Sequence, residues 1–127
     1  MTEEATRMNI RSGAPWEPLV GYSRAVRVGR FVAVSGSAAV DSEGGAYEQA
    51  QQCIEVIRAA LDEAGAALKD VVRTRMYVTD IEQWADIARA HQEAFGDVMP
   101  ATSMVEVSRL IDPGMLVEIE ADAIVAG

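Results

Sequence analysis

The residues of this chain with the clearest chemical potential are three carboxylates near its C-terminal end. Glu118, Glu120 and Asp122 recur at every second position within the run LVEIEADAIV. Alternate side chains of a strand point to one face, so the three would form one acidic row. Such a row is either a solvated outer face or, where burial raises the pKa of a carboxylate, a source of a group suited to general acid–base catalysis. The pattern alone leaves both interpretations open.

Other reactive side chains are scarce and isolated. His91 is the sole histidine and Cys53 the sole cysteine, which excludes an internal disulfide and the usual ligand set of a zinc site. We expect both to be structural, since His91 lies where a helix turns toward the sheet and Cys53 lies beside Ile54 within a helix. Gly44-Gly45 lacks the lysine of a phosphate-binding loop, and the Gly-x-Ser-x-Gly nucleophile pattern does not occur.

Composition limits the class of protein. The chain of 127 residues is 50% hydrophobic and 24% charged, so we expect a single domain over 1–127 that folds without a disulfide or metal. A net charge of −9, with no run of Lys and Arg, disfavours binding to a phosphate backbone. The N-terminal residues do not resemble a signal peptide, and no apolar stretch approaches the roughly 20 residues of a membrane span. With one cysteine, these features favour a soluble cytoplasmic protein.

Hydrophobic periodicity predicts the elements that must position these groups. Residues 1–20 are expected to be irregular, because glycine and prolines interrupt any pattern. A stripe of apolar residues predicts the first helix, and a Thr79–Glu82 capping box the start of the second, with Trp84 on its buried side. The predicted elements are a hairpin over 23–36, a helix over 47–64, a strand over 71–78, a helix over 81–95, and strands over 102–108 and 115–125.

The predicted order, β-β-α-β-α-β-β, defines an α+β fold: a single mixed β-sheet with two helices packed on one face through right-handed crossovers. We expect the last two strands to pair across a short turn at Asp112-Pro113-Gly114. In the strand over 71–78, Val72 is expected to share a face with Met76. The opposite sheet face retains apolar positions without a third layer, so we expect a homo-oligomer to bury it.

Over residues 20–125 the sequence resembles the RidA/YjgF family. PATSMVEV and VEIEA are similar to the family's Pro-Ala-Arg-Ser–Val-Glu-Val and Ile-Glu-Ile-Glu strands. Tyr22 ahead of the first strand, Val34-Ser35-Gly36 and the run RMYVTD follow in family order. The resemblance implies a chorismate-mutase-like fold, a homotrimer with small-molecule clefts between adjacent subunits, and no metal or cofactor.

The resemblance also assigns roles to individual positions. Active members hydrolyse an enamine or imine to ammonia and a 2-keto acid. By this likeness Tyr22 closes the pocket, Ser35 lines it, and Glu118 positions the attacking water. Met104 would line the site with its backbone, and Arg89 falls near a position commonly occupied by Asn.

The chain departs from the family pattern at Thr102, which stands where the family has the Arg that grips the substrate carboxylate. A guanidinium offers two parallel charged hydrogen bonds and a threonine hydroxyl offers one neutral bond. Losing one partner of a desolvated ion pair costs about 2–5 kcal/mol. Arg24, Arg75, Arg89 and Arg109 are candidate replacements, of which Arg89 is favoured by its place in the sequence; otherwise the pocket has changed its substrate.

The first functional prediction is therefore a hydrolase acting on C–N bonds, a RidA-like enamine/imine deaminase whose substrate preference is altered because Thr102 replaces the Arg. The alternative is a non-catalytic protein that binds or senses a small molecule in the same cleft. A ribonuclease or translation inhibitor is disfavoured by the net charge of −9. Arg73 and Arg75 alternate on a strand and are expected to make salt bridges to a neighbouring subunit.

Overall fold

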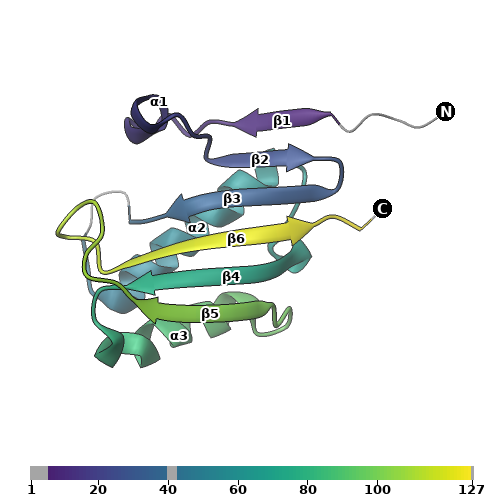
Figure 1. Cartoon of the computed structure of the whole chain (residues 1–127). Coiled ribbons are helices and arrows are strands. Elements are labelled where there is room, and N and C mark those ends of the chain that lie inside the picture. Colours follow the sequence, from purple (N-terminus) through teal and green to yellow (C-terminus); the bar gives the residue numbers. More distant parts are fainter. Residues whose placement is uncertain (1–5, 40–42, 127) are drawn as a thin grey trace.

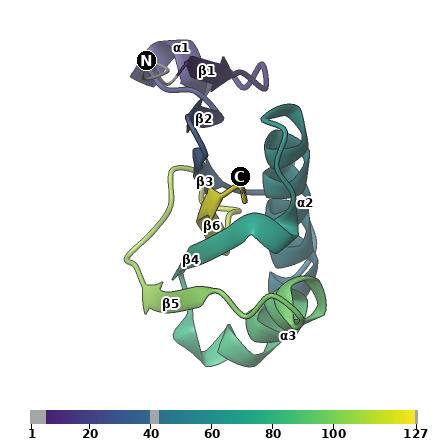
Figure 2. The same cartoon turned by 90° about the vertical axis from the view of Figure 1, so that its right-hand side faces the viewer.

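The computed structural model describes residues 6–39 and 43–126, which form one mixed sheet with α2 and α3 on one face (Figures 1 and 2). This confirms the predicted α+β fold. The strands are β1 (Arg7–Ile10), β2 (Ala25–Val28), β3 (Phe31–Ser37), β4 (Val71–Val78), β5 (Ala101–Glu106) and β6 (Val117–Ile124). The helices are α1 (Trp16–Val20), α2 (Ala46–Glu63) and α3 (Trp84–Phe95), with short 3-10 turns η1 (Leu68–Asp70) and η2 (Ile81–Gln83).

The N-terminal segment is more ordered than its sequence indicates. β1 adds an antiparallel strand beside β2, and α1 follows and ends at Gly21, whose φ of 90° suits glycine. The prediction of an irregular segment over 1–20 is thus wrong for these elements. Pro18 lies in the first helical turn, where its missing N–H costs nothing. Residues 1–5, and residues 41 and 42 of the loop before α2, lie outside the described part of the chain.

The last strand lies in the interior of the sheet. The strand order is β1-β2-β3-β6-β4-β5, and β6 is antiparallel to both of its neighbours (Figure 1). β5 pairs in parallel with β4, so the predicted pairing of the last two strands across an Asp-Pro-Gly turn is wrong. The connection over 107–116 instead crosses the end of β4. Two strands joined by a short connection normally pair as a hairpin. Here β6 does not pair with β5, because it pairs with β3 on one side and β4 on the other.

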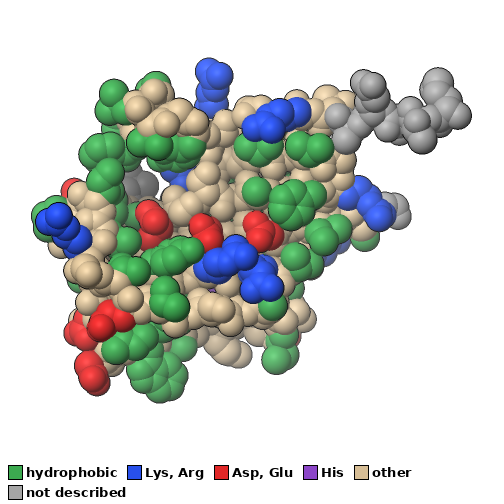
Figure 3. Space-filling model, in the orientation of Figure 1, with side chains coloured by type: hydrophobic (Ala, Val, Ile, Leu, Met, Phe, Trp, Pro, Cys, Tyr) green, Lys and Arg blue, Asp and Glu red, His purple; other side chains and the backbone are tan. Residues whose placement is uncertain are grey.

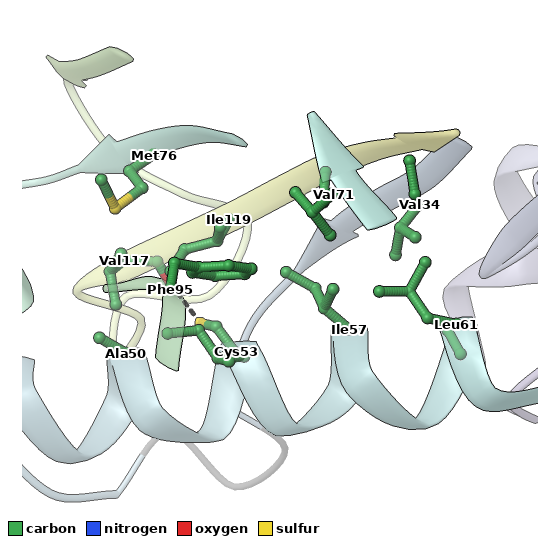
Figure 4. Close-up of a cluster of buried hydrophobic side chains, with 14 of the residues drawn as sticks. Val34, Ala50, Cys53, Ile57, Leu61, Val71, Met76, Phe95, Val117 and Ile119 are labelled. Carbon is green, nitrogen blue, oxygen red and sulfur yellow. Dashed lines mark hydrogen bonds between the residues drawn. The ribbon is translucent and has the colours of Figure 1, made fainter. Parts of the chain in front are cut away.

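The core lies between the sheet and the two long helices. Figure 4 shows the buried stripe of α2 against side chains from β3, β4 and β6. Ile57, Leu61 and Ile119 have no exposed surface, and burial of each such side chain contributes about 1.5–3 kcal/mol. Cys53 belongs to this core: its Sγ lies 3.6 Å from the carbonyl oxygen of Val117, and burial raises the pKa of the thiol to about 12.

A bulge changes which side chains of β4 face the core. Val71 and Arg73 pair with the consecutive residues Ala123 and Asp122, which leaves Val72 as an extra residue. Val71 is consequently buried, whereas Val72 is 44% exposed. The predicted alternation is therefore wrong at the start of this strand and holds from Thr74 onward.

The second helical segment begins differently from its prediction. Asp80, not Thr79, caps η2, by accepting a hydrogen bond from the Glu82 N–H at 3.0 Å. Trp84 is 57% exposed, so its predicted place on the buried side is wrong, whereas Ile87 of the same helix is buried. Within the described ranges, the chain has no helix with the length and apolar character needed to cross a bilayer.

Candidate active site

The three carboxylates lie on the outer face, which we define as the sheet face turned away from α2 and α3 (Figure 3). Two of them are held by neighbouring side chains of β4. Arg75 lies 3.4 Å from both Glu120 and Asp122, and the Tyr77 hydroxyl donates a 2.8 Å hydrogen bond to Glu120. Arg75 thus makes ion pairs within its own chain. The third carboxylate, Glu118, has a different environment.

Glu118 lines a cavity of about 1000 Å³. The walls are the outer face, the segment from Ser12 to Tyr22 with α1, and the connection over 107–116. Ala38 and Ala39 after β3 and Val56 of α2 also line the cavity. The hollow lies between α1 and this connection in Figure 3. Its polar lining includes Ser12, Tyr22, Arg24, Ser35, Arg109, Glu118 and Glu120.

The carboxylate of Glu118 is pressed against backbone rather than side chain. A Cβ at Gly36 would lie 2.7 Å from Glu118 Oε1, so only glycine leaves room for this carboxylate. Burial raises the pKa of Glu118 above its usual range; the charge of Arg24 opposes that rise and the charge of Glu120 adds to it. Gly36 therefore leaves space for the Glu118 carboxylate, and burial makes this carboxylate more basic. Both properties suit acid–base chemistry.

Arg24 organises the edge of the cavity. It is 7% exposed, and its guanidinium donates hydrogen bonds to the Gly36 carbonyl at 2.6 Å, to Ser37 Oγ at 3.2 Å and to Tyr22 Oη at 3.2 Å. The guanidinium also lies 5.5 Å from the centre of the Tyr22 ring. The sequence offered Arg24 only as one of several candidate cations. Its position two residues after Tyr22 was the available signal, because alternate residues of an extended segment point the same way.

A buried acid attaches α1 to this edge. Glu17 is 5% exposed, accepts hydrogen bonds from the Ser12 N–H and hydroxyl, and lies 3.9 Å from Arg24 Nε. Burial favours a higher pKa, but the hydrogen bonds from Ser12 and the charge of Arg24 outweigh it and hold the pKa of Glu17 below its usual value. Sequence reasoning missed Glu17 because it lies in the segment expected to be irregular.

Three of the six predicted site residues meet at this cavity: Tyr22, Ser35 and Glu118. They come from the segment before β2, from β3 and from β6. The Ser35 hydroxyl donates a 2.7 Å hydrogen bond to the Ser23 carbonyl, so its proton ties β3 to the segment bearing Tyr22. Ser35 therefore faces the cavity with its hydroxyl oxygen as an acceptor.

The other three predicted residues lie elsewhere in the chain. Thr102 Oγ1 lies 2.8 Å from Thr74 Oγ1 and bonds the Pro100 carbonyl at 3.1 Å, beside a second cavity of about 400 Å³. Met104 packs against the core on the helix side. The guanidinium of Arg89 lies 3.6 Å from the centre of the Tyr47 ring. Within one chain, the cations at the Glu118 cavity are Arg24 and Arg109, and Arg89 is not among its lining residues.

His91 lies in a structural network. Its Nε2 is 2.8 Å from Thr74 Oγ1, its ring centre is 4.7 Å from that of Phe95, and burial lowers its pKa. A neutral imidazole between a core threonine and a core phenylalanine suits packing. Among the described residues, His, Cys, Asp and Glu form no cluster able to hold a metal ion.

Comparison with known proteins places this fold and cavity in a family. The sequence profile described as Endoribonuclease L-PSP matches residues 13–125. A RutC family protein of Pyrococcus abyssi is 41% identical over 113 residues, covering 84% of this chain and 88% of that protein. The 2-iminobutanoate/2-iminopropanoate deaminase of Salmonella typhimurium is 33% identical over 111 residues, covering 81% of this chain and 86% of that protein.

Comparison with solved structures supports the same family. A Mycobacterium tuberculosis protein described as a member of the highly conserved YjgF/YER057c/UK114 family is 50% identical and superposes with a TM-score of 0.91, covering 94% of this chain and all of that one. The fold is thus the chorismate-mutase-like α+β fold expected from the sequence. The chain belongs to the endoribonuclease L-PSP family, also called the RidA/YjgF family.

Proposed function

We propose that this protein is an enamine/imine deaminase, a hydrolase that releases ammonia and a keto compound at the cavity beside Glu118. The observation that carries the proposal is the Glu118 carboxylate, seated against Gly36 in the same cavity as Tyr22 and Ser35. The name of the Salmonella relative supports this reaction class. The exchange of Arg for Thr at position 102 favours an altered substrate preference.

The reaction needs one water and a group that moves protons. As the water oxygen attacks the imine carbon, Glu118 takes a proton from the water and passes it to the nitrogen, which receives the electron pair of the C=N bond. The resulting carbinolamine loses ammonia when its C–N bond breaks and its hydroxyl becomes a carbonyl. Glu118 takes the hydroxyl proton and delivers it to the leaving nitrogen, so R₂C=NH and water become R₂C=O and ammonia. A carboxylate of raised pKa is a stronger base for the first step.

We also propose that the site is completed by a second subunit in a homotrimer. Thr102, Met104 and Arg89 lie away from Glu118 within one chain, and a cleft between subunits would bring these positions to the cavity of a neighbour. The outer face supports assembly, because Val28, Phe31 and Ile124 form an apolar row across three strands and are 38%, 46% and 49% exposed.

The test is turnover of imines generated in situ by an amino-acid oxidase, followed through the decay of imine and the release of ammonia. Wild type should accelerate the decay over buffer, and Glu118→Gln should remove the acceleration. The matched control is Glu63→Gln, because Glu63 is an exposed carboxylate at the C-terminal end of α2 and does not line the cavity. Buffer-like decay with wild type, for charged and uncharged imines alike, contradicts the proposal.

The second candidate function is a non-catalytic binder of small molecules. It is favoured by Thr102, whose hydroxyl is engaged by Thr74 and Pro100 and offers no charge to a carboxylate. Keto acids or aromatic carboxylates that raise the thermal midpoint while no imine is turned over would select this function. Ribonuclease activity remains disfavoured by the net charge of −9 and the acidic row on the outer face.

A further inference from the structure

The cavity is large, and one of its walls is apolar. Its volume of about 1000 Å³ is at the upper end for small-molecule sites and exceeds what an imino acid as small as iminobutanoate would fill. Trp16, Val20 and Ile111 line it and are 40%, 68% and 61% exposed. They come from α1 and from the connection over 107–116. This wall suits a ligand with a sizeable apolar group.

Among the described residues that line the cavity, Arg109 is the cation available to a ligand. The terminal nitrogens of Arg24 bond Gly36, Ser37 and Tyr22. Its Nε has no hydrogen-bond partner, but this atom is buried and lies 3.9 Å from Glu17. Arg109 is exposed and has no hydrogen-bond or ion-pair partner among the residues that the structure describes. An ionised Glu118 would repel a second carboxylate in the same cavity, so a negatively charged ligand needs a nearby cation.

The connection that carries Arg109 and Ile111 is anchored by a buried side chain. Gln49 of α2, which is 1% exposed, donates a 2.9 Å hydrogen bond to the Gly114 carbonyl and accepts a 2.8 Å bond from the Leu116 N–H. At its other end the Val107 N–H bonds the Val78 carbonyl at 2.8 Å. These bonds fix both ends of the connection, so Arg109 and Ile111 are held at the cavity without a ligand.

We infer that the cavity takes an imino acid with a large apolar side chain, its carboxylate paired with Arg109 and its side chain against Trp16 and Ile111. This inference rests on the proposed deaminase function and specifies its substrate class. A guanidinium can hold a carboxylate by two parallel charged hydrogen bonds. Arg109 on the 107–116 connection would thus provide the positive charge that Thr102 on β5 lacks. Each added methylene in an apolar pocket discriminates by about 10–200-fold.

The experiment compares imines made in situ from L-leucine, L-phenylalanine and L-alanine, together with the imine of benzylamine, which has no carboxylate. We expect kcat/KM for the first two to exceed that for the alanine imine by about tenfold or more. Arg109→Gln should lower kcat/KM for the imino acids by about tenfold or more and for the benzylamine imine by less than about threefold, with partial recovery in Arg109→Lys. Arg30→Gln, at the exposed turn of the β2–β3 hairpin, is the matched control.

Other outcomes overturn the inference. Equal rates for the alanine and leucine imines exclude the apolar pocket, and equal losses for charged and uncharged imines in Arg109→Gln exclude the carboxylate contact. Sedimentation of Arg109→Gln and Trp16→Ala should match wild type; dissociation would make them assembly residues instead.

A binding measurement separates this inference from the proposed function. 4-Methyl-2-oxopentanoate, the keto acid of the leucine imine, should raise the thermal midpoint of wild type and not of Arg109→Gln. Such binding without any turnover refutes the deaminase while the ligand class stands, and the absence of both turnover and binding refutes the two together.

Discussion

At the scale of single residues, Glu118 derives its chemical character from its neighbours. Glu120 and Asp122 share its strand face but are paired with Arg75, whereas Glu118 lies against the bare backbone of Gly36. Carboxylates at a spacing of two thus form ion pairs at two positions, whereas the third, Glu118, has no such pair and lines the cavity. Arg24 contributes by fixing Tyr22 and the Gly36 carbonyl beside it.

Replacing Glu118 by Gln should separate activity from stability. Loss of an acid–base group lowers kcat by about 10²–10⁴-fold. Because the folded pKa of Glu118 is raised, the native state holds this proton more tightly than the unfolded state, and the free energy of unfolding falls as pH rises through the interval between the two pKa values. Glu118→Gln should therefore be more stable than wild type at neutral pH and no more stable below the ordinary carboxyl range. Denaturant unfolding at both pH values measures this; a gain that is equal at both contradicts it.

Gly36→Ala should displace the Glu118 carboxylate, since the new Cβ would lie 2.7 Å from its Oε1. The flexible side chain can move away, so we expect a folded protein whose kcat is lower by about 10²-fold, the cost of a displacement near 1 Å. The double variant with Glu118→Gln provides the control. If the carboxylate is the target, Gly36→Ala should have little further effect in that background, and additive losses would show that it acts elsewhere.

At the scale of elements, α1 is held in place by a buried charge. A five-residue helix is not stable alone, and Glu17 supplies the contacts that attach it to Ser12 and Arg24. The helix in turn brings Trp16 and Val20 to the cavity wall. One acidic side chain in the N-terminal segment therefore helps to shape the cavity, whose proposed base, Glu118, comes from the last strand.

Glu17→Gln should loosen α1 in a pH-dependent way. Hydrogen bonds to a charged group contribute about 1.5–3 kcal/mol, so stability at neutral pH should fall by an amount of this order. The folded pKa of Glu17 is lowered, so its contribution is present above the unfolded pKa and disappears as pH falls through the folded value. Hydrogen exchange of residues 12–22 at neutral and acid pH measures the effect. Glu63→Gln, at an exposed position, is the control and should change neither the stability nor the hydrogen exchange of residues 12–22.

At the scale of the whole molecule, α2 and α3 cover one face of the sheet, and among the described residues no second layer of long helices covers the outer face (Figure 2). Its apolar row at Val28, Phe31 and Ile124 and the 48% exposed Val105 are surfaces that a second copy would bury. The same arrangement would bring β5 and α3 of one subunit toward the cavity of another. Assembly and activity are thus expected to depend on one another.

Val105→Asp should weaken this assembly. A charge on the outer face of β5 must be desolvated when the subunits pack, which costs several kcal/mol. Sedimentation at micromolar concentration should show a trimer for wild type and a lighter species for the variant. Ala59→Asp places the same charge on the exposed side of α2 and should leave the trimer unchanged. A monomeric wild type, or an equal effect of both variants, excludes the proposed interface.

Much of the fold could be predicted from local patterns. The α2 stripe, the β2–β3 hairpin and the alternation of β6 are properties of period and turn chemistry, which neighbouring residues in the chain define. The predictions failed where a distant segment decides the outcome: the bulge at Val72 depends on β6, and the exposure of Trp84 on how η2 leaves β4. α1 and β1 were missed because each is short and is held by contacts from β2 and Arg24.

The sequence by itself determined that this chain is a mixed α+β protein with an acidic row on one strand, and it led us to expect that Thr102 takes the place of an arginine. Those are features of spacing and residue type, which can be read directly from the amino-acid sequence. Only the tertiary structure decided that Glu118 lines a cavity without an arginine ion pair, whereas Glu120 and Asp122 pair with Arg75. It also decided that Arg24 and Arg109 rather than Arg89 line that cavity within one chain, and that β6 lies between β3 and β4. These depend on burial and on distances between segments far apart in the chain, and neither is encoded in local periodicity.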